Sequence, residues 1–372
     1  MTIFVGLLGL FLIFVIIWEG FETIILPRSV TRQLRLTRGY YRAIWPFCAA
    51  IARRLPDSQR QLYLSYFGPL SLPLLLVLWA QILILAFAMI QWALPQGLDR
   101  VPGMNQFETA LYESGVTFFT LGYGDVTPHT RITRFVAVLE AGVGFGFLAV
   151  VIGYLPVLYQ SFSRRESIIS LLDARASSPP SATEMLKRHS EGKNMTALVA
   201  LLASWEAWSS ELLESHLSYP VLSYYRSQHD RQSWLGALTC IMDTCTLILV
   251  GSPGNPEWQR ELQWQARMTL AMARHTVIDL VYIFNQQPVL PEIDRLPEAD
   301  RAKMREVLAA AGLPLCEGVA DDEKLTYLRG LYEPYVNALG QFLMFTLPPW
   351  LPEPGASDNW RTSAWDRDTR HF

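Results

Sequence analysis

Three long apolar segments, near residues 3–26, 66–94 and 135–159, constrain the fold of this chain more than any other feature. Each is long enough to cross a bilayer as a helix, which takes ~20 mainly apolar residues. Because lipid offers no partner for backbone N–H and C=O groups, such segments must be helical. The first segment has no basic residues before it and no evident cleavage site, so we expect a retained anchor rather than a signal peptide.

Composition separates the rest of the chain from these segments. The 372 residues are 51% hydrophobic, with a mean hydropathy of +0.18, which is too apolar for an ordinary soluble protein and too polar for a wholly membrane-embedded one. Residues 165–351 carry helical apolar spacing and several helix-start signals, and we expect an all-helical soluble domain there. The tail at 352–372 is rich in polar residues and is expected to be disordered. The four cysteines have no spacing typical of a disulfide framework or a zinc site.

The arginines predict the orientation in the membrane. Eight of them lie between the first two apolar segments, whereas the loop between the second and third segments has three. The positive-inside rule then places the basic linker at residues 28–62 and the C-terminal region in the cytoplasm. We expect a multi-pass protein of the inner (plasma) membrane with its N-terminus outside.

The loop before the third apolar segment contains a short run with a clear chemical meaning. Asn105 and Glu108 have the spacing of a capping box, which predicts a short helix that ends near Phe119. The helix is followed by Thr120-Leu121-Gly122-Tyr123-Gly124-Asp125. Glycine permits the positive-φ conformations with which a backbone can aim successive carbonyl oxygens at one axis. Such a line of oxygens can replace the hydration shell of a potassium ion.

This run resembles the selectivity filter of the potassium channel superfamily, with Leu121 in place of the commoner valine. The resemblance covers roughly residues 66–160, and it implies a re-entrant pore helix at 107–119 whose dipole points its negative end at the ion path. It also implies the residues of the filter: K+ at Thr120, Leu121, Gly122 and Tyr123, with Gly124 after them. A filter needs four such loops around an axis, so one copy per chain implies a homotetramer.

Three further residues are candidates for support of the filter or for gating. The family uses an acid at the position of Asp125 as a brace of the outer mouth. Glu140 lies inside the third apolar segment, where an acid must face protein or water, and we expect it to hydrogen-bond the pore helix rather than to lie near the permeation path. Gly144 is close to where the family's inner helices carry a hinge glycine. Close packing of small residues explains Gly144 equally well.

The linker carries a basic stripe at helical spacing, made of Arg32, Arg35, Arg38 and Arg42. A voltage sensor would have such a stripe, but only one apolar segment comes before it. An amphipathic helix on anionic lipid explains the stripe better, because each arginine near such a surface contributes about 1 kcal/mol. Trp45 and Phe47 would suit the same interface.

Residues 234–250 are very apolar, but they are too few for a comfortable span and include Asp243. We therefore expect a buried core helix, in which Asp243 needs a partner. Arg274 and His275 are the candidates that the sequence offers. A last helix is expected from residue 321 to about 347.

The predicted fold is an all-α membrane protein: three transmembrane helices with a re-entrant pore helix and filter, then an all-helical cytoplasmic domain. The expected domains are an anchor at 1–27, a linker at 28–62, a pore domain at 63–164, a helical domain at 165–351 and a tail at 352–372. The expected function is passive potassium conduction, with no enzymatic activity, cofactor or nucleic-acid partner. The alternatives are a poorly selective cation pore and a membrane-anchored signalling or scaffold protein with a vestigial pore.

Overall fold

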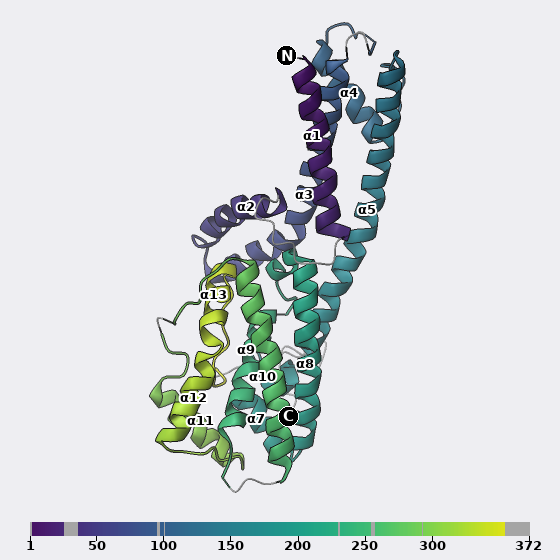
Figure 1. The fold of residues 1–372 in the computed structure, drawn as a ribbon. Helices are drawn as coiled ribbons and strands as arrows, with labels where there is room; N and C mark the ends of the chain where they lie inside the picture. Colours follow the sequence, from purple (N-terminus) through teal and green to yellow (C-terminus); the bar gives the residue numbers. More distant parts are fainter. Residues whose placement is uncertain are drawn as a thin grey trace, which may run out of the picture. The chain divides into compact units, whose positions relative to one another are not determined.

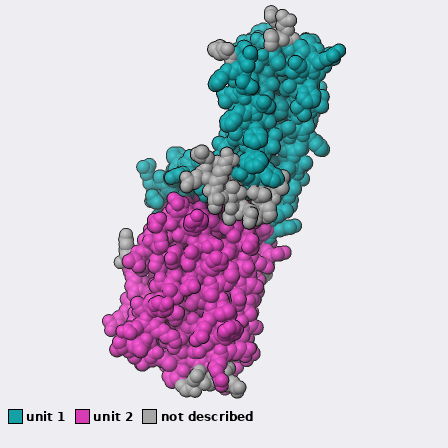
Figure 2. Space-filling model, viewed as in Figure 1, with its two compact units in different colours: residues 1–160 teal, residues 161–372 magenta. Residues whose placement is uncertain are grey.

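The computed structural model describes residues 2–25, 36–94, 97–99, 101–229, 231–253, 257–291 and 293–353. The chain forms two compact units, residues 1–160 and 161–372, which Figure 2 shows in different colours. Within the described ranges the regular elements are all helices, and a single isolated bridge joins Leu98 to Pro128. The predicted all-α fold is confirmed.

Unit 1 holds the helices that are long and apolar enough to cross a membrane, namely α1, α3 and α5 (Figure 1). Its elements are α1 (Thr2–Gly20), the π-helical turn η1 (Phe21–Ile25), α2 (Leu36–Ala52), α3 (Asp57–Ala93), α4 (Gln106–Phe118) and α5 (Arg131–Ser170), whose last turns, from residue 161, belong to unit 2. The three predicted spans are therefore confirmed as helices. Two of the helices are longer than expected, because polar residues with good helix propensity continue α3 before residue 66 and α5 beyond residue 159.

Helices α1 and α3 lie side by side and pack along each other in unit 1 (Figure 1). Small residues permit this close approach: a Cβ on Gly9 of α1 would stand 2.5 Å from the backbone oxygen of Ala86 on α3. Such small-residue contacts are typical of helices that pack inside a membrane, where burial of apolar surface provides no driving force.

Unit 2 is a bundle built on α8, α9 and α10 (Figure 1). Its elements are α6 (Asp173–Ala176), α7 (Ala182–Glu191), α8 (Met195–Ser218), η2 (Pro220–Tyr224), α9 (Trp234–Val250), α10 (Glu257–Ile283), α11 (Glu298–Ala310), α12 (Val319–Gly330) and α13 (Glu333–Leu343). Every residue of α9 is buried, so the expected core helix at 234–250 is confirmed. Most of the predicted tail, from residue 354 onward, lies outside the described residues.

The expected last helix, from 321 to about 347, is wrong as one helix. The structure has two helices, α12 and α13, with Tyr332 between them at φ −135°. Pro334 explains the break, because proline has no N–H to bond the carbonyl of Gly330, four residues before it, and its ring would clash with that carbonyl in a continuous helix. Helix α13 then ends early, at Met344, which adopts the left-handed conformation.

The end of α5 is fixed inside unit 2 by Arg165. Its side chain is buried and donates hydrogen bonds to the carbonyl oxygens of Leu222 (2.9 Å) and Tyr225 (3.0 Å), and it pairs with Glu166 at 2.8 Å. Burial of a charge is tolerated only with such complete pairing. The third apolar helix therefore has its last turns built into the packing of the second unit.

Asp243 on the buried helix α9 has a partner that differs from both candidates. The guanidinium of Arg295 binds both carboxyl oxygens of Asp243, at 2.9 and 3.0 Å, and Tyr332 donates to the same carboxyl at 2.5 Å. Arg295 also pairs with Glu333 at 2.9 Å. The Arg274 and His275 proposals are thus corrected, and His275 lies near Asp279 instead. Sequence could not identify Arg295, because it comes from a segment outside any regular helix.

Replacement of Arg295 by Met is predicted to destabilise unit 2 by about 3–5 kcal/mol, because it leaves Asp243 buried with no counter-charge. The measurement is the thermal or urea unfolding of the full-length protein in detergent, followed by tryptophan fluorescence. Arg231→Met is the matched control, since Arg231 forms an exposed pair with Glu353 and its loss should cost less than about 1 kcal/mol. Equal losses in the two variants would contradict this assignment.

Candidate functional site

Helix α4 begins as the sequence predicts. The side chain of Asn105 accepts hydrogen bonds from the backbone N–H groups of Phe107 and Glu108, and the Glu108 carboxylate accepts one from Asn105 N–H at 2.9 Å. Both halves of the capping box are therefore formed. This cap fixes the start of a short helix that lies in the loop between two membrane-crossing helices.

The end of α4 is closed by hydrogen bonds that leave the next residue in a left-handed conformation. Leu121 N–H bonds the carbonyl of Val116 at 2.8 Å, and Thr120 N–H bonds that of Thr117 at 3.0 Å, which is the Schellman arrangement. Thr120 therefore stands where most helices have glycine, with φ +57°. For a β-branched residue this conformation costs on the order of 1–3 kcal/mol, so it needs a reason.

In the run from Thr120 to Gly124, the backbone angle φ alternates in sign. Thr120, Gly122 and Gly124 have φ values of +57°, +59° and +75°, whereas Leu121 and Tyr123 between them do not have positive φ. Left-handed residues at every second position keep the segment out of regular helix and strand. The predicted site residues Thr120 to Gly124 therefore share one continuous, irregular backbone segment.

The segment after this run is held by side chains from two places. The Tyr112 hydroxyl on α4 donates to the Asp125 carboxylate at 2.8 Å. Asp99 accepts bonds from Thr127, through its N–H at 2.9 Å and its hydroxyl at 2.7 Å, and contacts His129 Nε2 at 2.6 Å. The bonds from Thr127, with that of His129, hold the pKa of Asp99 below its usual range.

Behind α4, Glu140 of α5 joins three helices. Its carboxyl group is fully buried, contacts the Ser114 hydroxyl on α4, and accepts a bond from the Gln91 amide on α3 at 2.9 Å. Ser114 also bonds the backbone oxygen of Ile84 on α3, at 2.7 Å. The carboxyl group therefore lies where α3, α4 and α5 meet, in contact with α4.

Gly144 lies where α5 approaches the end of α4. A Cβ built on Gly144 would stand 2.0 Å from the backbone oxygen of Phe118, a distance that no side chain tolerates. Cβ atoms on Gly142, Gly146 and Gly153 would meet nothing within 4 Å in the same subunit. Of the two readings of Gly144, this contact favours close packing, and α5 runs through the position as one helix.

Several residues of this site were not identified from the sequence: Gln91, Asp99, Tyr112 and Ser114. Each is brought to its partner by tertiary packing, and none belongs to a motif. The signal that could have found Ser114 is the helical register of α4, since a polar side chain on its buried face predicts a polar partner opposite.

Helix α5 has little contact with the rest of its own subunit. Only 11% of its most apolar 18-residue window is buried, against 50% for the corresponding window of α3. Phe145 is 69% exposed and Ile152 63% exposed. The run itself is open on one side, with Tyr123 68% exposed. Exposed apolar surfaces of this size are typical of regions that contact lipid or another protein.

Helix α2 forms part of the predicted basic linker. Arg32 and Arg35 lie outside the described residues, whereas Arg38 and Arg42 are exposed on α2. The expected interface role of Trp45 is wrong: it is 4% exposed, and its ring packs against Phe67 of α3.

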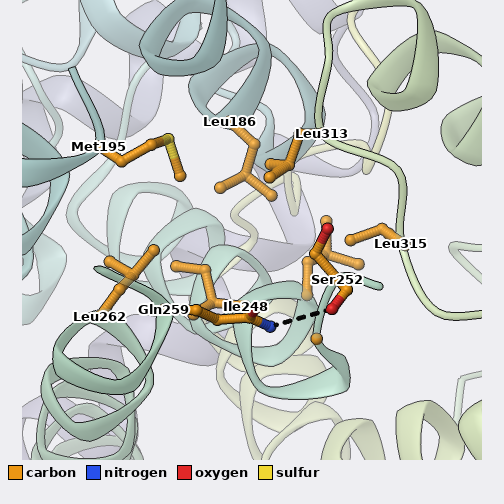
Figure 3. Close-up of a pocket in the computed structure, with 10 residues that line it drawn as sticks. Leu186, Met195, Ile248, Ser252, Gln259, Leu262, Leu313 and Leu315 are labelled. Atoms are coloured by element: carbon orange, nitrogen blue, oxygen red, sulfur yellow. Dashed lines mark hydrogen bonds between the residues drawn. The ribbon is translucent and has the colours of Figure 1, made fainter. Parts of the chain in front are cut away.

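Unit 2 contains a small aliphatic pocket, shown in Figure 3. Leu186, Met195, Ile248 and Leu262 point into it, together with Gln259, whose Nε2 lies 3.5 Å from the Ser252 backbone oxygen. The lining is almost wholly hydrocarbon. Within the described residues, no group of three His, Cys, Asp or Glu side chains is arranged to hold a metal ion.

Comparison with known proteins gives a family match for the part of the chain that contains the run. The model of a family described as "Ion channel" matches residues 74–160. The curated "Uncharacterized membrane protein YdjJ" of Bacillus subtilis (strain 168) is 24% identical over 271 residues, which is 71% of this chain and 76% of that protein. An alignment of this length must include part of unit 2.

Two shorter relatives match as well. Both are named "Protein LctB", from Bacillus caldotenax and Geobacillus stearothermophilus, and are 38% and 37% identical over 87 residues. The aligned part is 21% of this chain and 64% of each relative, so less than two thirds of either relative is covered. No solved structure matches the chain. The family match supports the resemblance seen in the sequence: the chain is a membrane protein with an ion-channel domain at residues 74–160.

Proposed function

We propose that this ion channel is selective for potassium, and that four copies of the chain assemble to form its pore. The alternation of φ between positive and non-positive values along Thr120–Gly124 carries the proposal. A backbone of this kind offers a row of carbonyl oxygens on one side, which is the chemistry that replaces the water around a potassium ion. The ion sites are then the carbonyl oxygens of Thr120, Leu121, Gly122 and Tyr123.

The conformation of Thr120 supports the same proposal. Glycine would fit its left-handed backbone without strain, yet a β-branched residue stands there. Threonine adds a hydroxyl oxygen at the first position of the row, and an additional ion ligand is a reason for the strain. Tyr112 and Asp99 support the proposal from the other end, because they hold the segment that follows the row.

The exposure of α5 supports a tetramer. One subunit supplies one loop, and a ring of carbonyl oxygens around an ion needs four. Assembly around an axis would cover the bare apolar surface of α5 and give Tyr123 neighbours from adjacent subunits. In the proposed orientation the run faces the outside of the cell, and the basic linker and unit 2 lie in the cytoplasm.

Helix α2 is the proposed contact with anionic lipid. Tyr40 and Trp45 contact α3, whereas Phe47 (69% exposed), Arg38 and Arg42 are exposed on α2. A helix that exposes an aromatic ring and two arginines suits the headgroup region, where the ring enters lipid and the cations meet phosphate.

Gly122→Asp is expected to abolish potassium flux into liposomes that contain the purified protein, while membrane insertion continues. Aspartate at φ +59° distorts the carbonyl row and adds a side chain and a charge beside it. In the unaltered protein, sodium should have no effect on the potassium flux. Gly103→Asp is the matched control, since Gly103 also has positive φ (+86°) and open space around it, but lies before α4. Normal conduction by the Gly122 variant would refute the filter assignment.

Gly144→Ala is expected to lower both potassium flux and heat stability, because the new methyl group forces α5 away from the backbone of Phe118. Overpacking of this kind typically costs about 1–3 kcal/mol. Gly142→Ala and Gly146→Ala serve as controls, since their methyl groups meet nothing in the subunit. A Gly144 variant with unchanged stability but altered opening would favour the hinge instead.

Neutralisation of Arg38 and Arg42 by Gln is expected to reduce the anionic lipid retained by the purified protein, measured by native mass spectrometry. Two arginines near a lipid surface contribute about 2 kcal/mol together. The conductance–voltage curve should barely change, and a large shift would support the voltage-sensor alternative. Arg231→Gln, an exposed arginine of unit 2, should leave lipid retention as it is.

A further inference from the structure

The contacts of Ser114 require more protons than a serine and a carboxylate can supply. Its hydroxyl oxygen lies 2.7 Å from the backbone oxygen of Ile84 and also within hydrogen-bond distance of Glu140 Oε1. A serine hydroxyl has one proton to donate, and a backbone carbonyl can only accept. An ionised Glu140 would also only accept, so one of the two oxygen–oxygen contacts would contain no proton.

Nothing around Glu140 supplies the missing proton or separates the oxygens. Ser114 and Glu140 are both fully buried within the subunit, so bulk water cannot separate the oxygens. The other carboxyl oxygen, Oε2, accepts from the Gln91 amide. In the described part of the chain no basic side chain pairs with Glu140, and the ionisable group whose charge acts on it is the acid Glu113 on α4. An unpaired carboxylate at this depth would be costly.

We propose that Glu140 is a neutral carboxylic acid that donates its proton to Ser114. Glu140 Oε1–H then donates to the Ser114 oxygen, the Ser114 hydroxyl donates to the Ile84 carbonyl, and Gln91 donates to Glu140 Oε2. Every proton in this chain has one acceptor, and no charge is buried. Glu140 acts as a positioning residue, because the chain of bonds ties α4 to both α3 and α5 directly behind the run that begins at Thr120.

The protonation itself is independent of which ion the channel conducts, whereas its effect on conduction rests on the proposed function. The first experiment is therefore spectroscopic. Infrared spectra of the full-length protein in liposomes at neutral pH should contain a carbonyl band of a protonated carboxylic acid that is lost in Glu140→Gln. Glu108→Gln, which alters an exposed acid at the start of α4, should leave the band in place. Identical spectra for the unaltered protein and Glu140→Gln would overturn the proposal.

A second variant tests the partner. Ser114→Ala removes the acceptor of the Glu140 proton, so the acid band should move to the frequency of a free carboxylic acid rather than disappear. An unmoved band would show that the proton is not donated to Ser114. This measurement remains informative even if Glu140→Gln folds poorly.

Conservative replacement separates this chemistry from a merely structural role. Glutamine is neutral and can donate from its amide to Ser114, so Glu140→Gln should retain heat stability and potassium flux, whereas Glu140→Ala should lose both. Alkaline pH should reduce flux in the unaltered protein and leave Glu140→Gln unaffected. If Glu140→Gln fails as badly as Glu140→Ala, the neutral-acid assignment is wrong. The infrared band could respond as expected while neither the unaltered protein nor any variant conducts potassium. In that case the proposed function fails and this inference stands.

Discussion

Backbone N–H and C=O groups that leave a helix lose their regular partners, and this constraint governs the segment between α4 and α5. The run from Thr120 to Gly124 leaves the helical pattern between two helices that are long and apolar enough to cross a membrane, so its surroundings must hold it in place. A closed helix end comes before it, the Tyr112–Asp125 bond and the Asp99 contacts follow it, and the buried carboxyl of Glu140 lies behind its helix. The site is thus as much a set of supports as a sequence motif.

The two units pack their helices in different ways. In unit 1, close approach between helices depends on glycines such as Gly9 and Gly144, because lipid is as apolar as the side chains and packing must come from backbone contact. Unit 2 buries a complete apolar helix, α9, whose one acid is neutralised by Arg295 and accepts a hydrogen bond from Tyr332. Helix α5 runs through both, since Arg165 binds its last turns into unit 2.

Sequence predicted the local features well, because each depends on neighbouring residues. The capping box at Asn105 formed as expected, the membrane-crossing segments are helical, and residues 234–250 form a core helix. Predictions that needed long-range contacts did worse. Asp243 pairs with Arg295 instead of the two candidates, and Trp45 packs on α3 instead of facing lipid. The break in the expected last helix has a local cause, because Pro334 interrupts it.

By itself, the sequence determined the apolar lengths, the helix caps and the glycines of the run, since propensity, hydropathy and backbone freedom are properties of single residues and their neighbours. Only the tertiary structure decided which polar groups meet. Ser114, Gln91 and Glu140 are far apart in the chain and belong to three helices, and their bonds exist because packing fixes the rotation of each helix about its axis. That rotation depends on all contacts of a helix at once, and no short stretch of sequence encodes it.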